Sequence, residues 1–169
     1  MIRENIVKEF GEAYISLLMY NLGFKVDRLD EKGIDLACYK DNYKYGVSVK
    51  ARNIHFTDNK NVQLEYNDIV YTYDESKIRG LVPAYAFVIA SVERIDIFIF
   101  THEYMFKKYF SNDKKGIRDI YYYKSFYSSR KDKGSAKHIP ISFKAREHWK
   151  TISDEEGVIF TASYNKICK

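Results

Sequence analysis

The chain is 169 residues long, with 46% hydrophobic residues and a formal net charge of +5; this fits one domain over residues 1–169 with a core of its own. Its two cysteines, Cys38 and Cys168, lie far apart, and no signal-peptide pattern opens the chain, which excludes a disulfide-rich secreted scaffold and predicts a reduced, cytoplasmic setting. The most apolar stretch, residues 81–100, is interrupted by a proline and by charged residues, so it predicts two strands and excludes a membrane span.

The N-terminal third predicts a helix followed by a three-stranded antiparallel meander. Apolar residues recur at near-helical spacing between Asn5 and Leu22, and Gly23 stands where a helix would stop. The recurring apolar residues are Ile6, Phe10, Leu17 and Leu18, and the opposite, polar face carries Glu4, Lys8 and Glu12. Three runs then read as strands: FKVDRL, GIDLACY and YKYGVSVKAR, with KDN as a tight turn between the last two.

The rest of the chain predicts one more helix and several strands. Residues 64–80 have helical character and end at Gly80, and the β-branched and aromatic runs PAYAFVIASV and RIDIFIF follow as two strands. Residues 107–137 show no clean period and predict a loop with short elements. Near the C-terminus we expect a strand at HIPISF, a short polar helix near KAREHWKTIS and a strand at GVIFTA.

The charge is distributed unevenly along the chain. Residues 1–104 carry 13 Lys and Arg against 16 Asp and Glu, whereas residues 105–150 carry 13 against 4. This basic block also contains eight aromatic residues in its first part: Phe106, Tyr109, Phe110, Tyr121, Tyr122, Tyr123, Phe126 and Tyr127. Cations mixed with flat rings suit phosphates and bases, so nucleic acid is the indicated partner. The alternative is a solvated basic face whose tyrosines pack into the core.

The third strand of the meander separates polar from apolar side chains. Period two places Ser48, Lys50 and Arg52 on one face and Val47, Val49 and Ala51 on the other. In the neighbouring strand, Asp35 lies between Ile34 and Leu36, so we expect it to point away from their buried face and to lie beside Lys50. A carboxylate next to an ammonium stabilises both charges and offers oxygen ligands to a cation such as Mg²⁺.

Three of these residues resemble the motif series of the PD-(D/E)XK nuclease superfamily, and its Holliday-junction-resolvase-like and Mrr-like members above all. They are Glu12 in GEAYISLLMYNLGF, Asp35 in GIDL and Lys50 in VSVKAR. The resemblance covers residues 5–100 as a nuclease-like core and leaves residues 105–150 as a basic, aromatic-rich extension. It implies a restriction-endonuclease-like α/β fold, a mixed sheet flanked by helices in the order αβββαβ.

The resemblance also implies a reaction and the residues that perform it. Asp35 would bind Mg²⁺ or Mn²⁺ with the Val49 carbonyl, Lys50 would orient the attacking water and offset charge on the phosphate, and Glu12 would support the metal. The implied activity is hydrolysis of phosphodiester bonds in DNA, in which cation and lysine stabilise the charge that gathers on phosphorus. Many such nucleases are dimers, so a homodimer is an expectation from the resemblance.

Ser48 departs from the family pattern, which has an acid or Gln two residues before the lysine. A serine hydroxyl adds neither charge nor reach, so metal affinity should fall. Either Glu12, Glu65 or Asp68 fills the gap, or the site has lost catalysis and the protein only binds nucleic acid.

Simpler interpretations of these residues remain open. Asp35 and Lys50 could form a structural ion pair, and Glu12 could be an ordinary solvated helix residue. Arg52 and His55 follow the lysine and are secondary candidates for phosphate contact. Besides the nuclease and the inactive binding module, a third alternative is a domain that binds an acidic protein through its tyrosine-rich surface.

Overall fold

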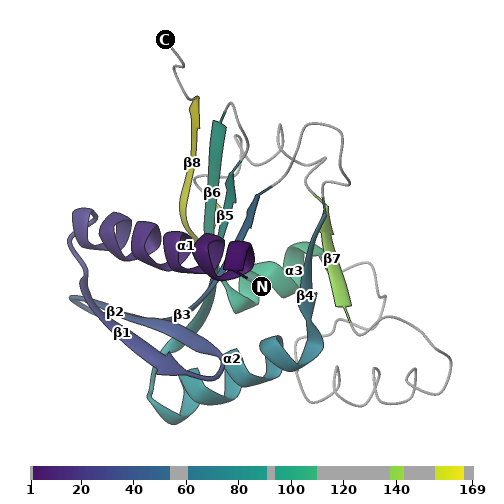
Figure 1. Ribbon diagram of the computed structural model, residues 1–169. Coiled ribbons are helices and arrows are strands. Elements are labelled where there is room, and N and C mark those ends of the chain that lie inside the picture. Colours follow the sequence, from purple (N-terminus) through teal and green to yellow (C-terminus); the bar gives the residue numbers. More distant parts are fainter. Residues whose placement is uncertain (1, 54–60, 91–93, 110–137, 143–154, 166–169) are drawn as a thin grey trace, which may run out of the picture.

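The computed structural model describes residues 2–53, 61–90, 94–109, 138–142 and 155–165 (Figure 1). These residues form three helices and eight strands. In chain order the elements are α1 (Ile2–Asn21), β1 (Lys25–Glu31), β2 (Ile34–Lys40), β3 (Tyr43–Asn53), β4 (Asn61–Glu65), α2 (Tyr66–Ile78), β5 (Val82–Ala90), β6 (Arg94–Thr101), α3 (His102–Tyr109), β7 (His138–Ser142) and β8 (Val158–Asn165).

Six of the strands form one mixed sheet in the order β1-β2-β3-β5-β6-β8, and β4 and β7 pair separately. Strands β1, β2 and β3 are an antiparallel meander, and β5 lies parallel to β3. The α2 crossover makes this pairing possible because parallel neighbours need a long connection. The predicted fold class, an α/β fold with a mixed sheet flanked by helices, is confirmed. Two elements differ from the expectation: β4, which precedes α2, and α3, which follows β6.

Several helices and strands end where the sequence predicts. α1 is followed by Gly23 and α2 by Gly80, both at positive φ, of +88° and +66°, the backbone region that glycine adopts without steric cost. Asp41, in the predicted KDN turn, also has a positive φ of 50°. Strands β5, β6, β7 and β8 match the predicted β runs.

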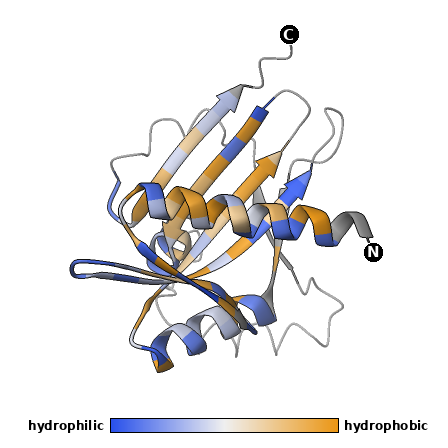
Figure 2. Ribbon diagram, turned by 60° about the vertical axis from the view of Figure 1, so that its left-hand side comes forward, coloured by the Kyte–Doolittle hydropathy of each residue, from blue (hydrophilic) through white to orange (hydrophobic). Residues whose placement is uncertain are grey.

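Helices cover both faces of the sheet. α1 crosses one face, where its Ile15 and Met19 join a buried cluster with the strand residues Val47, Val49 and Ala51 (Figure 1). α2 and α3 contact β5 from the other side. Strands β5 and β6 are hydrophobic over most of their length (Figure 2), as expected for strands that are buried on both faces.

The face of α1 that meets the sheet is mostly not the predicted one, because of the four predicted apolar residues only Leu18 packs against the core. Ile6, Phe10 and Leu17 are 60%, 43% and 59% exposed, and Glu12, assigned to the solvated face, has a side chain only 13% exposed. Apolar residues occur all around this helix, so periodicity alone could not identify the buried side. The orientation brings Glu12 toward the sheet.

Gly11 allows α1 to pack close to β3. A Cβ added at Gly11 would lie 2.5 Å from the Cβ of Ala51 and 3.6 Å from a Val49 methyl group. Carbon atoms in contact are normally about 3.5–4.0 Å apart, so a side chain at position 11 would push the helix away. This contact therefore sets the position of Glu12, the next residue.

We expect Gly11→Ala to destabilise the protein by about 1–3 kcal/mol, the range for overpacking a core. In an ordinary helix interior the same change would stabilise by up to about 1 kcal/mol, so the sign is diagnostic. Chemical denaturation of Gly11→Ala, Ala51→Gly and the double variant measures the effect. The double variant should recover part of the loss; a stabilising Gly11→Ala would contradict the close approach.

Other predictions have partial answers. Within the described residues, no helix combines the length and apolar character needed to cross a membrane. Of the basic block, Phe106 is buried and stacks on His102 at 4.2 Å between ring centroids. The alternative concerned the tyrosines of the block, whose side chains lie outside the described residues. Residues 110–137 and the expected helix at 144–153 lie outside the described residues, and the division into core and extension stays a prediction.

Candidate functional site

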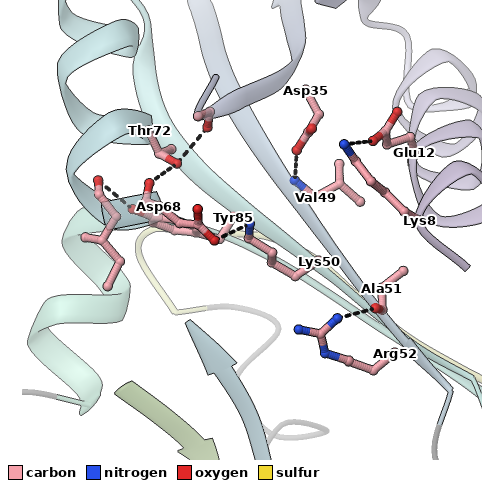
Figure 3. A network of polar contacts seen from close by, with 12 residues as sticks. Lys8, Glu12, Asp35, Val49, Lys50, Ala51, Arg52, Asp68, Thr72 and Tyr85 are labelled. Carbon is pink, nitrogen blue, oxygen red and sulfur yellow. Dashed lines mark hydrogen bonds and ion pairs between the residues drawn. The ribbon is translucent and has the colours of Figure 1, made fainter. Parts of the chain in front are cut away.

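The candidate site begins where β2 and β3 separate. Their antiparallel register runs from the pair Lys40–Tyr43 to the pair Leu36–Val47. Beyond this register the Asp35 side chain, in place of a backbone carbonyl of β2, accepts a hydrogen bond from β3. The backbone N–H of Val49 donates to Asp35 Oδ2 at 2.6 Å (Figure 3). A buried backbone N–H needs an acceptor, so the carboxylate has a structural role as well as a candidate chemical one.

The surroundings of Asp35 disfavour its negative charge. Burial raises the pKa of the Asp35 carboxyl, and the charge of Glu12 raises this pKa further. The hydrogen bond from Val49 and the positive charges of Lys50 and Lys8 lower the pKa but do not reverse the shift. A carboxylate held at an energetic cost next to a second carboxylate is typical of functional sites.

Glu12 faces Asp35 from α1 and is held by two cations. Its Oε2 accepts from Arg28 Nη2 at 2.8 Å, and its Oε1 lies 3.5 Å from Lys8 Nζ. The side chains of Arg28 and Lys8 are 57% and 66% exposed, whereas that of Glu12 is 13% exposed. Both cations can swing into solvent, so a metal cation could take their place at Glu12.

Lys50 forms its ion pair with α2 and not with Asp35. Its Nζ donates to Asp68 Oδ2 at 2.7 Å, with the two side chains 21% and 35% exposed (Figure 3). The expectation of a direct Asp35–Lys50 pair is corrected in this respect, although Lys50 is near enough to lower the pKa of Asp35. Asp68 lies in the first turn of α2, where the helix dipole favours a carboxylate.

Ser48 and the secondary candidates lie around these residues. Ser48 is only 2% exposed and is paired with Tyr85 of β5 in the register, so the polar face of β3 is buried here and not open to solvent. Arg52 is exposed, and its Nη1 lies 3.4 Å from the carbonyl oxygen of Ala51. His55 and the side chain of Glu65 lie outside the described part of the structure.

A buried polar network supports the site from α2. Thr72 Oγ1 lies 2.7 Å from the carbonyl oxygens of both Gly33 and Asp68. The Tyr85 hydroxyl lies 3.1 Å from His102 Nδ1, and burial lowers the pKa of His102 to about 3, so the imidazole is neutral at physiological pH. The Thr72 contact joins α2 to the residue before β2, and the Tyr85 contact joins β5 to α3.

The donor atoms suit magnesium better than zinc. Asp35 and Glu12 provide two carboxylates, and the carbonyl of Val49 points to the same side of β3 as the N–H that Asp35 binds, because both groups of a strand residue share one side. Mg²⁺ is commonly held by one or two carboxylates and otherwise by water and phosphate. No group of three or more Asp, Glu, His or Cys within the described residues is arranged to hold a metal, whereas structural zinc sites use four such ligands.

Comparisons with known proteins found similarity among solved structures only. No protein-family model matches the chain, and no curated protein matches it. Among solved structures it is similar to Hjc, a Holliday junction resolvase from Archaeoglobus fulgidus, with 10% sequence identity and a TM-score of 0.43 over 56% of this chain and 71% of the resolvase. A similarity at this level carries no information about the chemistry of the site.

Proposed function

We propose that this protein is a metal-dependent nuclease that hydrolyses phosphodiester bonds in DNA. One observation carries the proposal: Asp35 of β2 accepts from the Val49 amide of β3 at 2.6 Å, and it lies close enough to Glu12 of α1 and Lys50 of β3 for both charges to shift its pKa. Two acids and a lysine from three separate elements lie around the Val49 amide. The central acid is Asp35, and burial disfavours its ionised form. A purely structural role would favour a direct pair with Lys50.

Each residue has a distinct part in the proposed reaction. Asp35 and Glu12 would hold Mg²⁺ or Mn²⁺ with the Val49 carbonyl, and the cation would supply positive charge beside the phosphate and a more acidic bound water. Lys50 would donate a hydrogen bond to a phosphate oxygen as negative charge gathers there. Asp68 orients Lys50 through the ion pair at 2.7 Å and is the acid we propose to offset the one missing at position 48.

The test separates the chemical step from metal binding. We expect Lys50→Met to reduce cleavage of plasmid and branched DNA at least about 100-fold, the cost of losing one transition-state donor. Its affinity for Mn²⁺, measured by calorimetric titration, should stay within a few-fold of wild type because Lys50 is not a metal ligand. If wild-type protein cleaves neither DNA form with Mg²⁺ or Mn²⁺, while remaining folded, the nuclease proposal is wrong.

A second function, DNA binding without cleavage, is favoured by one observation. Ser48 is buried where the family pattern has a metal-binding side chain, and Lys50 is already paired with Asp68. This function predicts DNA binding that weakens steeply with salt and is unchanged by metal or by Asp35→Ala.

We also propose a homodimer and a cytoplasmic setting. The molar mass in solution tests the homodimer.

A further inference from the structure

We infer that Thr72 is a positioning residue whose hydroxyl fixes the separation between the strand that carries Asp35 and the helix that carries Asp68. The inference rests on the proposed function, because it gives Thr72 a role in that site. Thr72 touches none of the reacting groups and would act through these two acids.

The hydroxyl of Thr72 connects segments that are far apart in sequence. Thr72 is fully buried, and its Oγ1 lies 2.7 Å from the carbonyl oxygen of Gly33, 39 positions earlier, and 2.7 Å from that of Asp68. The Asp68 carbonyl is also the acceptor for the Thr72 amide in a regular helix, since N–H groups donate four residues back. Gly33 is therefore the backbone partner that depends on the hydroxyl, and Tyr85 is a side-chain partner of the same hydroxyl.

The turn before β2 is pressed against α2 at the same place. Gly33 has φ +98°, and a Cβ added there would lie 2.6 Å from the carbonyl carbon of Tyr71 and 2.9 Å from the Thr72 nitrogen. Two backbones are thus in direct contact beside the hydroxyl, and Asp35 follows two residues later. A hydrogen bond at this contact limits sliding of β2 along the helix.

The contact of Thr72 with Asp68 leads on to Lys50. Asp68 lies one helical turn before Thr72, and its Oδ2 accepts from Lys50 Nζ at 2.7 Å. Asp35 binds the Val49 amide, next to Lys50 in the chain. These contacts form a closed ring of interactions. The Thr72 hydroxyl completes it between Gly33, before β2, and Asp68 of α2 (Figure 3).

Ser76 provides a matched control on the same helix. It lies one turn after Thr72 and is equally buried, but within the described residues its Oγ has no hydrogen-bond partner. Ser76→Ala therefore removes a hydroxyl at the same depth without breaking a bond. Thr72→Val removes the Thr72 hydroxyl with little change of shape, and Thr72→Ser keeps it.

The experiment compares these three variants with wild type by hydrogen exchange of the Val49 amide and by Mn²⁺ titration. We expect Thr72→Val to speed exchange of this amide at least about 10-fold relative to other β3 amides. We also expect it to weaken Mn²⁺ binding about 10-fold or more, as loss of a group that orients a metal ligand does. Thr72→Ser should restore both values, and Ser76→Ala should leave both within about twofold.

Two outcomes overturn these ideas separately. If Thr72→Val lowers the free energy of unfolding but leaves the Val49 exchange rate and the Mn²⁺ affinity unchanged, Thr72 is a structural residue and the inference is wrong. If wild-type protein binds no Mn²⁺, the proposed function fails; faster Val49 exchange in Thr72→Val would then still support the positioning of Asp35.

Discussion

Asp35→Asn should abolish metal binding and reduce DNA cleavage at least about 100-fold, while the protein becomes no less stable. Asn keeps an oxygen that accepts from the Val49 amide, so the hydrogen bond at 2.6 Å can persist. It removes a charge that burial and Glu12 disfavour. We therefore expect the free energy of unfolding to stay within about 1 kcal/mol of wild type or to exceed it, as for other residues retained for function and not for stability.

The pH dependence of this difference follows from the raised pKa of Asp35. In wild type, stability is lost as the pH rises through the folded-state pKa of Asp35, because the buried carboxyl must then ionise. The Asn variant has no such loss. Its advantage should therefore be largest at neutral pH and should shrink when the pH falls below the ordinary aspartate pKa of about 3.9, as measured by urea unfolding at both pH values.

Asp27→Asn is the matched control for this variant. Asp27 also lies on a strand of the meander, but its side chain is 45% exposed and pairs with Lys25 at 3.4 Å. We expect it to leave Mn²⁺ affinity and cleavage unchanged. A loss of 2 kcal/mol or more in Asp35→Asn, in a protein that does not cleave DNA, would identify Asp35 as a structural residue.

Gly33→Ala should cost about 3 kcal/mol of folding free energy, because two separate effects combine. The backbone at φ +98° is unfavourable for a residue with a Cβ, and that Cβ would lie 2.6 Å from the backbone of Tyr71. Thermal and urea unfolding measure the loss. If the variant folds, its β2 start must shift, so we also expect weaker Mn²⁺ binding.

Gly80→Ala separates these two effects. Gly80 has a positive φ of +66°, but a Cβ added there meets no atom within 4 Å. The loss should therefore be only the conformational part, about 1 kcal/mol, with no change in metal affinity. Equal losses for the two variants would contradict the close contact between the β1–β2 turn and α2.

The candidate site was only partly predictable from the sequence. Period two separated Ser48 and Lys50 from Val47 and Val49, because neighbouring strand residues point to opposite faces whatever the tertiary structure. The ion pair of Lys50 with Asp68 and the role of Thr72 depend on a helix that packs against β2 and β3. No local pattern marks such a contact, apart from the four-residue spacing that places Asp68 and Thr72 on one side of a helix.

By itself the sequence determined several elements and the fold class: the meander, α2 ending before Gly80, the strands β5 and β6 and hence an α/β fold. These depend on local preferences, which act between residues close in the chain. Only the tertiary structure decided which face of α1 is buried, because that choice depends on Gly11 meeting Ala51. The same packing turns Glu12 toward Asp35, so the pair of acids on which the proposed chemistry depends is a product of contacts between distant segments.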